Sequence, residues 1–127
     1  MSDQEWSFSY EQPLHEVFPA LHEAQSAWLG QIESLRALDR KTHELVRMVC
    51  TVILRNGGGV RRHARLATEV GATWEEIVAA VVLTQPGFGI LPAVEALPDA
   101  RRGYEEGLAV RAAELDGDGD GDGGGDD

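Results

Sequence analysis

The chain has 127 residues, with 22 Asp and Glu against 11 Lys and Arg, and so a formal net charge of −11. This length fits one domain, and a hydrophobic content of 43% is enough for a core. An acidic chain lacks the basic surface of a general nucleic-acid binder and is repelled by anionic membranes, so both classes are excluded. Six of the acidic residues lie in the last twelve positions, which leaves the preceding part near −5.

The chain has a single cysteine, Cys50. One cysteine excludes an intrachain disulfide, a C-x-x-C redox pair and a cysteine zinc cluster. The first ten residues have neither the basic start nor the apolar stretch of a signal peptide, and the longest apolar run, residues 77–83, is too short to span a bilayer. We therefore expect a soluble cytoplasmic protein.

Residues 1–12 are predicted to form an N-terminal arm, because Trp6, Phe8 and Tyr10 alternate with polar residues. The arm is either extended and docked on a surface or poorly ordered, and the pattern leaves both open. A first helix is predicted over residues 13–31. Pro19 interrupts it, since proline favours the first turn of a helix.

A second helix is predicted over residues 39–55, with Asp39 as its N-cap. Most of its surface is apolar, and its polar residues form one narrow stripe, which is typical of a largely buried helix. Cys50 lies on the apolar side, where we expect a small buried hydrophobe. The stripe consists of Arg40, Glu44, Arg47, Thr51 and Arg55.

The Asn56-Gly57-Gly58-Gly59 segment ends this helix, and its glycines predict a sharp reversal through left-handed backbone. A third helix is predicted over residues 60–70, ended by Gly71. One face of it carries His63 among small apolar residues, namely Val60, Ala64, Ala67 and Val70.

Thr73-Trp74-Glu75-Glu76 is a capping box, which predicts a fourth helix as far as residue 84. Its centre, residues 77–83, is apolar all round and is predicted to be a core helix. A Pro-Gly turn over residues 85–89 precedes a last helix over residues 91–115, bent at Pro98. No strand pattern occurs, so the fold class is all-α, a compact bundle of five to six helices over residues 13–115.

The last twelve residues, 116–127, are an Asp-Gly repeat for which we predict disorder, because no hydrophobe offsets its ordering entropy. The repeat matches part of a calcium-binding loop. However, the final ligand is Asp127 rather than a glutamate and no exiting helix follows, so we expect no calcium site there. No spacing of His15, His22 and His43 indicates another metal site.

One motif carries chemistry: Glu44, Asn56, Gly59 and His63 read Glu-x(11)-Asn-x-x-Gly-x(3)-His. With its surroundings, this pattern resembles the carboxymuconolactone decarboxylase / alkyl hydroperoxidase D family. The resemblance spans residues 14–110. Its matching segments are residues 38–45, 62–67 and 71–77 and the Pro-Gly pair at 86–87.

The hydroperoxidase branch of that family has two reactive cysteines at the positions of Asn56 and Gly59, with the equivalents of Glu44 and His63 in a proton relay. Neither Asn nor Gly replaces a thiolate, and Cys50 has no resolving partner. The missing cysteines therefore disfavour a peroxiredoxin-type activity.

The decarboxylase branch is similar in lacking the cysteine pair and keeping the histidine. The resemblance implies a cofactor-free lyase, without metal, acting on a small carboxylated lactone or related metabolite. His63 would donate the proton, Glu44 would orient it, and Arg62, Arg65 and Asn56 would hold the substrate. The family forms trimers and hexamers, so we expect a homo-oligomer.

Each of these residues also has a structural explanation. Glu44 lies between Arg40 and Arg47 at helical spacing, which a solvated ion-pair stripe explains, and His63 fits a core histidine. In an antiparallel hairpin, Glu44 would lie about 18 Å from the turn and His63 about 6 Å. They meet only if the helices cross steeply, if water connects them, or if a second subunit contributes. A catalytically silent oligomeric binding or scaffold protein is therefore the alternative function.

Overall fold

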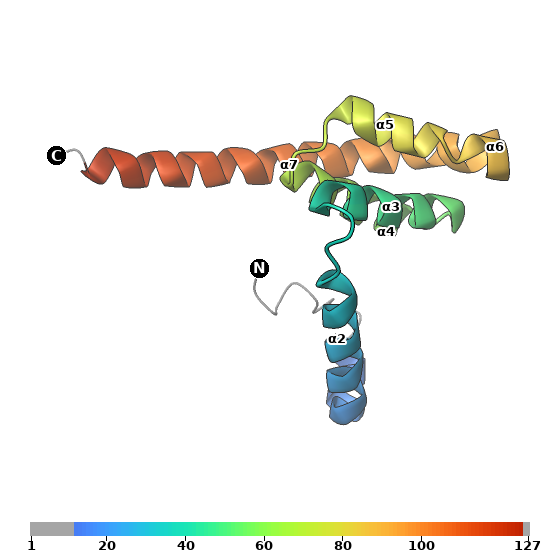
Figure 1. The fold of residues 1–127 in the computed structure, drawn as a ribbon, viewed down its shortest axis with the longest axis horizontal. Helices are drawn as coiled ribbons and strands as arrows, with labels where there is room; N and C mark the ends of the chain where they lie inside the picture. The colour runs from blue at the N-terminus through green and yellow to red at the C-terminus, as the bar shows by residue number, and fades with distance from the viewer. Residues whose placement is uncertain (1–11, 126–127) are drawn as a thin grey trace. The chain divides into compact units, whose positions relative to one another are not determined.

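The computed structural model describes residues 12–125, with side chains over residues 13–117. No strand occurs in this range, which confirms the all-α class (Figure 1). The predicted N-terminal arm lies outside the described residues except for Gln12, which begins the first helix. The helices are α1 (Gln12–Val17), α2 (Pro19–Glu33), α3 (Arg40–Ile53), α4 (Gly57–Glu69), α5 (Trp74–Val82), α6 (Gln85–Phe88) and α7 (Ile90–Gly125).

The described chain divides into two compact units between Ala37 and Leu38, whereas the sequence predicts one domain over residues 13–115. The division falls in residues 34–39, which leave the helical conformation between α2 and α3. The first unit contains the hairpin of α1 and α2, with the predicted break at Pro19. Its large apolar side chains, including Phe18 and Trp28, remain mostly exposed within the chain.

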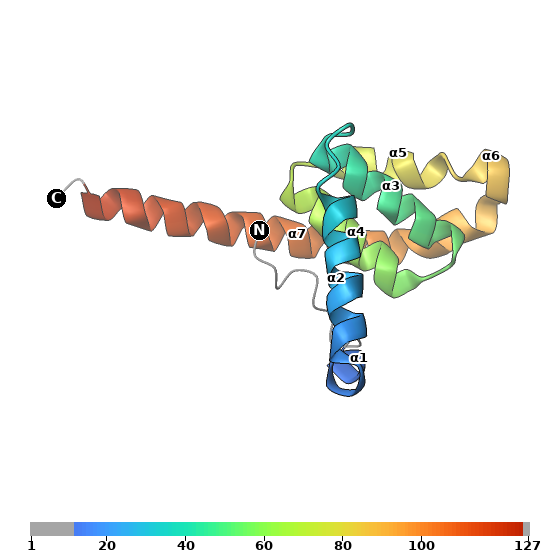
Figure 2. The same ribbon diagram turned by 60° about the horizontal axis from the view of Figure 1, so that its bottom comes forward.

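The second unit contains α3 to α7, and α4 packs against both α3 and α7 (Figures 1 and 2). Its core consists of medium and small apolar side chains from these helices and α5. The fully or almost fully buried members are Met48, Val52, Val60, Ala64, Ala67, Ala72, Ile77, Val81, Ala93, Ala96 and Ala100.

Small residues on one face of α7 let it approach the backbone of α4 closely. A Cβ atom added to Gly103 would lie 2.1 Å from the carbonyl oxygen of Arg61, and one added to Gly107 would lie 2.8 Å from that of Arg65. Real side chains do not tolerate such distances, so glycine is needed at both positions. The resulting contact holds α4 firmly, and with it the residues that α4 presents.

The predicted caps of α3 and α5 are confirmed. Asp39 accepts a hydrogen bond from the backbone N–H of Thr42 at 2.7 Å. Thr73 and Glu76 form the full capping box, with distances of 3.1 Å and 3.0 Å. Glu76 also pairs with Lys41 at 2.7 Å, which links the starts of α3 and α5.

The connection from α3 to α4 differs from the prediction. The glycine run does not form a left-handed reversal; Gly57, Gly58 and Gly59 are the first turn of α4, and the Asn56 side chain caps them by accepting from the N–H of Gly59 at 3.0 Å. The left-handed residue is instead Arg55, with a φ of 56°. Since Asn56 is an effective N-cap, α4 begins three residues earlier than predicted.

Two positions of α3 differ from the prediction, although its apolar side is buried at Met48 and Val52 as expected. Glu44 of the polar stripe is only 1% exposed, while Cys50 on the apolar side is exposed. The solvated ion-pair explanation of Glu44 and the buried position of Cys50 are therefore wrong. The physical reason is that α4 offers Glu44 a buried polar partner, which no helical periodicity within α3 reveals.

Exposed apolar residues also correct the predictions for α4 and α5. In α5 only Ile77 and Val81 are buried, whereas Leu83, just after the helix, is 76% exposed. Val70, expected on the buried face of α4, is exposed as well. A single chain thus leaves uncovered a part of the apolar surface that the sequence assigns to the core.

Helix α7 keeps Pro98 in its interior and runs past the other helices of its unit (Figure 2). It continues to Gly125, whereas the sequence predicts disorder from residue 116. Residues 111–117 are exposed, so no packing stabilises this part of the helix. Among the described helices, none combines the length and the apolar character needed to cross a membrane.

Candidate active site

Glu44 of α3 and His63 of α4 meet inside one chain. The distance from Glu44 Oε2 to His63 Nδ1 is 3.4 Å. The side chain of Glu44 is 1% exposed and that of His63 is 10% exposed. Removing a carboxylate and an imidazole from water costs free energy, and their interaction offsets that cost. Buried titratable pairs of this kind often mark functional sites, so this pair is the candidate catalytic dyad.

The lengths of the helices explain why the two residues meet. Helix α3 ends at Ile53, two residues before the predicted end, and α4 begins at Gly57, three residues before the predicted start. Glu44 is then about 13.5 Å from the end of α3 and His63 about 9 Å from the start of α4, at 1.5 Å per residue. The two side chains meet directly within one chain, so neither a connecting water molecule nor a second subunit is needed.

Arg47 is a third member of this group. Its Nη1 atom lies 3.7 Å from Glu44 Oε1, one turn along α3. Burial by itself raises the pKa of Glu44. The hydrogen bond and charge of His63, together with the charges of Arg47 and Arg40, outweigh burial and hold the pKa of Glu44 below its ordinary value. Glu44 is thus a carboxylate at neutral pH.

An ionised Glu44 determines the orientation of the imidazole. A carboxylate only accepts hydrogen bonds, so Nδ1 of His63 must carry the proton and donate it to Oε2. Nε2 is then the ring nitrogen left to exchange a proton with a bound molecule. The 3.4 Å distance is long for such a bond, as is common before a substrate tightens the geometry.

The predicted substrate ligands have identifiable neighbours. Asn56 is exposed and its side-chain oxygen caps α4. Arg65 Nη1 pairs with Glu69 Oε2 at 3.0 Å, so Arg65 would exchange that partner for a substrate carboxylate. Arg62 is partly buried and directly precedes His63 in α4. Their roles in binding stay predictions.

Sequence reasoning missed the part that Thr51 plays at this site. A Cβ atom added to Gly59 would lie 2.6 Å from Thr51 Cγ2, while the Thr51 hydroxyl donates to the carbonyl of Met48 at 2.6 Å. Position 59 therefore has no room for any side chain unless Thr51 moves. The signal was present, because Thr51 belongs to the polar stripe that turns inward at Glu44.

Comparison with known proteins supplies a family for this geometry. Residues 19–101 match the family model described as the carboxymuconolactone decarboxylase family. The matched range includes the cap of α3, the dyad, the capping box and the start of α7, and it ends before Gly103 and Gly107. No curated protein matches the chain, and no solved structure matches it.

Proposed function

The chain belongs to the carboxymuconolactone decarboxylase family, and from this premise we propose that it is a cofactor-free acid–base lyase. Its substrate would be a small carboxylated lactone or a related metabolite. The observation that carries the proposal is the buried contact between Glu44 and His63. It would supply an oriented proton donor, which such a decarboxylation requires in addition to ligands for the substrate carboxylates.

The reaction would proceed in one bond-breaking step and one proton transfer. The bond between the substrate carbon and its carboxylate breaks, CO2 leaves, and the electron pair stays on the substrate, spread over its conjugated lactone. Doubly protonated His63 then gives the Nε2 proton to the substrate and keeps the Nδ1 proton, which it donates in a hydrogen bond to Glu44. One proton is consumed per turnover, and water restores it to His63.

Glu44 supports this cycle through its charge. An ionised Glu44 accepts the hydrogen bond from Nδ1 and so fixes the orientation of the imidazole ring. Arg47 and Arg40 keep Glu44 ionised, so the proton resides on the histidine rather than on the carboxyl group. Arg62, Arg65 and Asn56 are the proposed ligands of the substrate carboxylates, with arginine suited to bidentate binding.

The test is release of CO2 from carboxymuconolactone by the purified full-length protein. We expect His63→Ala to lower kcat by about 100-fold or more, the usual contribution of a general acid. Glu44→Gln should lower kcat less and shift the pH profile. His15→Gln, in the exposed α1, is the matched histidine control and should leave the rate unchanged.

A folded His63→Ala protein with full activity would overturn the proposal. Absence of turnover in the wild type, with a related series of carboxylated lactones also inert, would favour the second candidate, a catalytically silent binding or scaffold member. The observation that supports this second candidate is the low exposure of the His63 side chain, 10%. Ligand-induced thermal stabilisation without turnover would identify this second function.

Peroxidase chemistry has little support. Asn56 and Gly59 occupy the positions that the family resemblance assigns to reactive thiols, and Gly59 is packed against Thr51. Cys50 is exposed on α3 and is the only thiol of the chain. A peroxidatic thiolate without a resolving thiol is overoxidised or needs an outside thiol.

We also propose that the protein acts as a homo-oligomer, a trimer or a hexamer, in the cytoplasm. Large exposed apolar residues near the ends of α3 and α5 support the proposal of an oligomer, because association would remove them from water. They include Leu54 at 75% and Leu83 at 76% exposure. Cell fractionation tests the location.

A further inference from the structure

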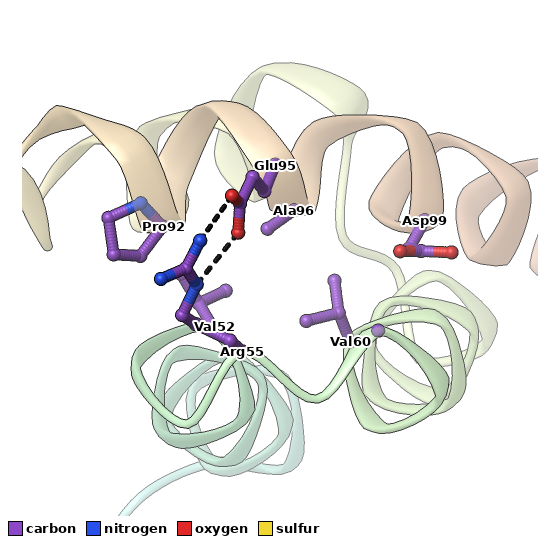
Figure 3. Close-up of a pocket in the computed structure, with 8 residues that line it drawn as sticks. Val52, Arg55, Val60, Pro92, Glu95, Ala96 and Asp99 are labelled. Carbon is purple, nitrogen blue, oxygen red and sulfur yellow. Dashed lines mark hydrogen bonds and ion pairs between the residues drawn. The ribbon is translucent and has the colours of Figure 1, made fainter.

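A cavity of about 160 Å³ lies where the end of α3, the start of α4 and the first half of α7 meet (Figure 3). It is separate from the dyad, since neither member lines it. Its inner wall is apolar and its rim is charged. The inner wall comprises Val52, Val60 and Ala96, and the rim comprises Arg55, Glu95 and Asp99.

Arg55 closes one end of the cavity at a conformational cost. It has a φ of 56°, the left-handed position that follows the end of α3, whereas Gly71 occupies the corresponding position after α4. Glycine is favoured there, so an arginine is retained at some expense of stability. Its guanidinium makes a two-fold hydrogen bond with the carboxylate of Glu95, as Figure 3 shows.

Asp99 lies at the other end of the cavity, one turn after Glu95 on α7 (Figure 3). Gly57 leaves room for it, because a Cβ atom there would lie 2.5 Å from Asp99 Oδ2. Asp99 Oδ1 pairs with Arg102 at 3.1 Å, but the Arg102 side chain is 61% exposed. Such a solvent-exposed pair contributes little and exchanges readily. Asp99 is therefore the rim charge that a ligand can use.

From this arrangement we propose that the cavity binds a small protonated amine with a compact apolar body. The body lies against Val52, Val60 and Ala96, and the ammonium group donates to Asp99. The size fits, because an apolar cavity of about 150 Å³ holds a benzene molecule. An anion of equal size would face the carboxylate of Asp99, while the rim cation Arg55 is already paired with Glu95. This site is additional to the proposed lyase site and does not depend on it.

The experiment is a titration of the full-length protein followed by the NMR methyl signals of Val52, Val60 and Ala96. The probes are cyclohexylamine, the neutral cyclohexanol and the anionic cyclohexanecarboxylate. We expect saturable shifts with the amine at an affinity about tenfold or more above that of the alcohol, from one charge-assisted hydrogen bond. The carboxylate should bind more weakly than either.

Asp99→Asn, which keeps the size of the side chain, should reduce the affinity for the amine to that for the alcohol. Glu105→Gln is the matched control, because Glu105 pairs with Arg101 on the same helix outside the cavity and should leave binding unchanged. Added salt provides a test that needs no variant, since it should weaken binding of the amine and not of the alcohol.

Three results would overturn the proposal. They are the absence of saturable shifts of the three methyl groups with the amine, tighter binding of the carboxylate than of the amine, and equal amine affinity in the wild type and Asp99→Asn. The second result would identify Arg55 as the binding group.

Discussion

Glu44 shows how a buried charge is maintained in a small domain. Its carboxylate is almost fully buried between His63 and Arg47, and its pKa nevertheless lies below the ordinary 4.5. Removing one partner of a buried ion pair destabilises the fold by more than the intact pair stabilises it, because the remaining charge stays buried without a partner. The protonation state of Glu44 is therefore expected to affect both the free energy of unfolding and the proposed reaction.

This coupling predicts a pH-dependent effect of Glu44→Gln. A carboxyl whose folded-state pKa is lowered stabilises the fold above its unfolded-state pKa, and that stability is lost as pH falls through the folded-state pKa. We expect the variant to be less stable than the wild type by about 1–3 kcal/mol at neutral pH. The difference should shrink below about pH 4.5, the ordinary value for glutamate.

Urea denaturation at a series of pH values measures this effect. The pKa values of Asp39, Glu76 and Glu106 are lowered as well, by hydrogen bonds to Thr42, Lys41 and Arg61 respectively. These groups are present in both proteins, so their contributions cancel in the difference. Parallel stability curves over the whole acid range would contradict the lowered pKa of Glu44.

At the scale of elements, the contact between α4 and α7 holds α4, the helix that carries His63. Small residues line α7 where it crosses α4, and two of them approach a backbone carbonyl too closely to carry a side chain. Helices in such contact cannot slide without opening voids or clashes. The Asn56 cap fixes the start of α4, and this start determines how far along the helix His63 lies relative to Glu44.

A pair of glycine substitutions in α7 tests this contact. Gly103→Ala places a Cβ atom 2.1 Å from the Arg61 carbonyl oxygen, so we expect a loss of about 1–3 kcal/mol in the free energy of unfolding. Gly117→Ala, on the same helix with no atom within 4 Å, should be neutral or stabilising by up to about 1 kcal/mol. Denaturant midpoints measure both, and equal effects would contradict the close approach.

At the scale of the whole molecule, the chain leaves much of its apolar surface uncovered. The last turns of α3 and α5 and the start of α7 expose several large apolar side chains, among them Leu54, Leu83 and Ile90. Association of identical chains is the simplest way to cover surface of this kind. Of these residues, Leu83 belongs to the segment 77–83 that the sequence assigns to the core.

A charge placed on this surface tests the oligomer. Leu83→Glu should shift the mass in analytical ultracentrifugation from three or six chains toward the 13.8 kDa monomer, because a buried charge at an interface is unfavourable. Arg111→Glu, in the exposed part of α7, is the control for added negative charge and should leave the mass unchanged. A wild type that is already monomeric would contradict the proposal.

The sequence by itself determined the local features of this protein. Helical periodicity, the Asp39 cap, the Thr73–Glu76 capping box and the break at Pro19 depend on residues within one turn of each other, so their physics is present in the sequence. The motif also identified Glu44 and His63 together. The sequence did not determine which face of each helix is buried. Periodicity shows which residues share a face, but it does not show what packs against that face.

Only the tertiary structure decided which residues are buried, whereas the start of α4 depends on the local Asn56 cap. The burial of Glu44 depends on a histidine 19 positions away, and the space at Gly59, Gly103 and Gly107 depends on atoms of other helices. Burial of a charge is favourable only when a partner is present in three dimensions. The contact of Glu44 with His63 is therefore a property of the fold, although both residues were evident in the sequence.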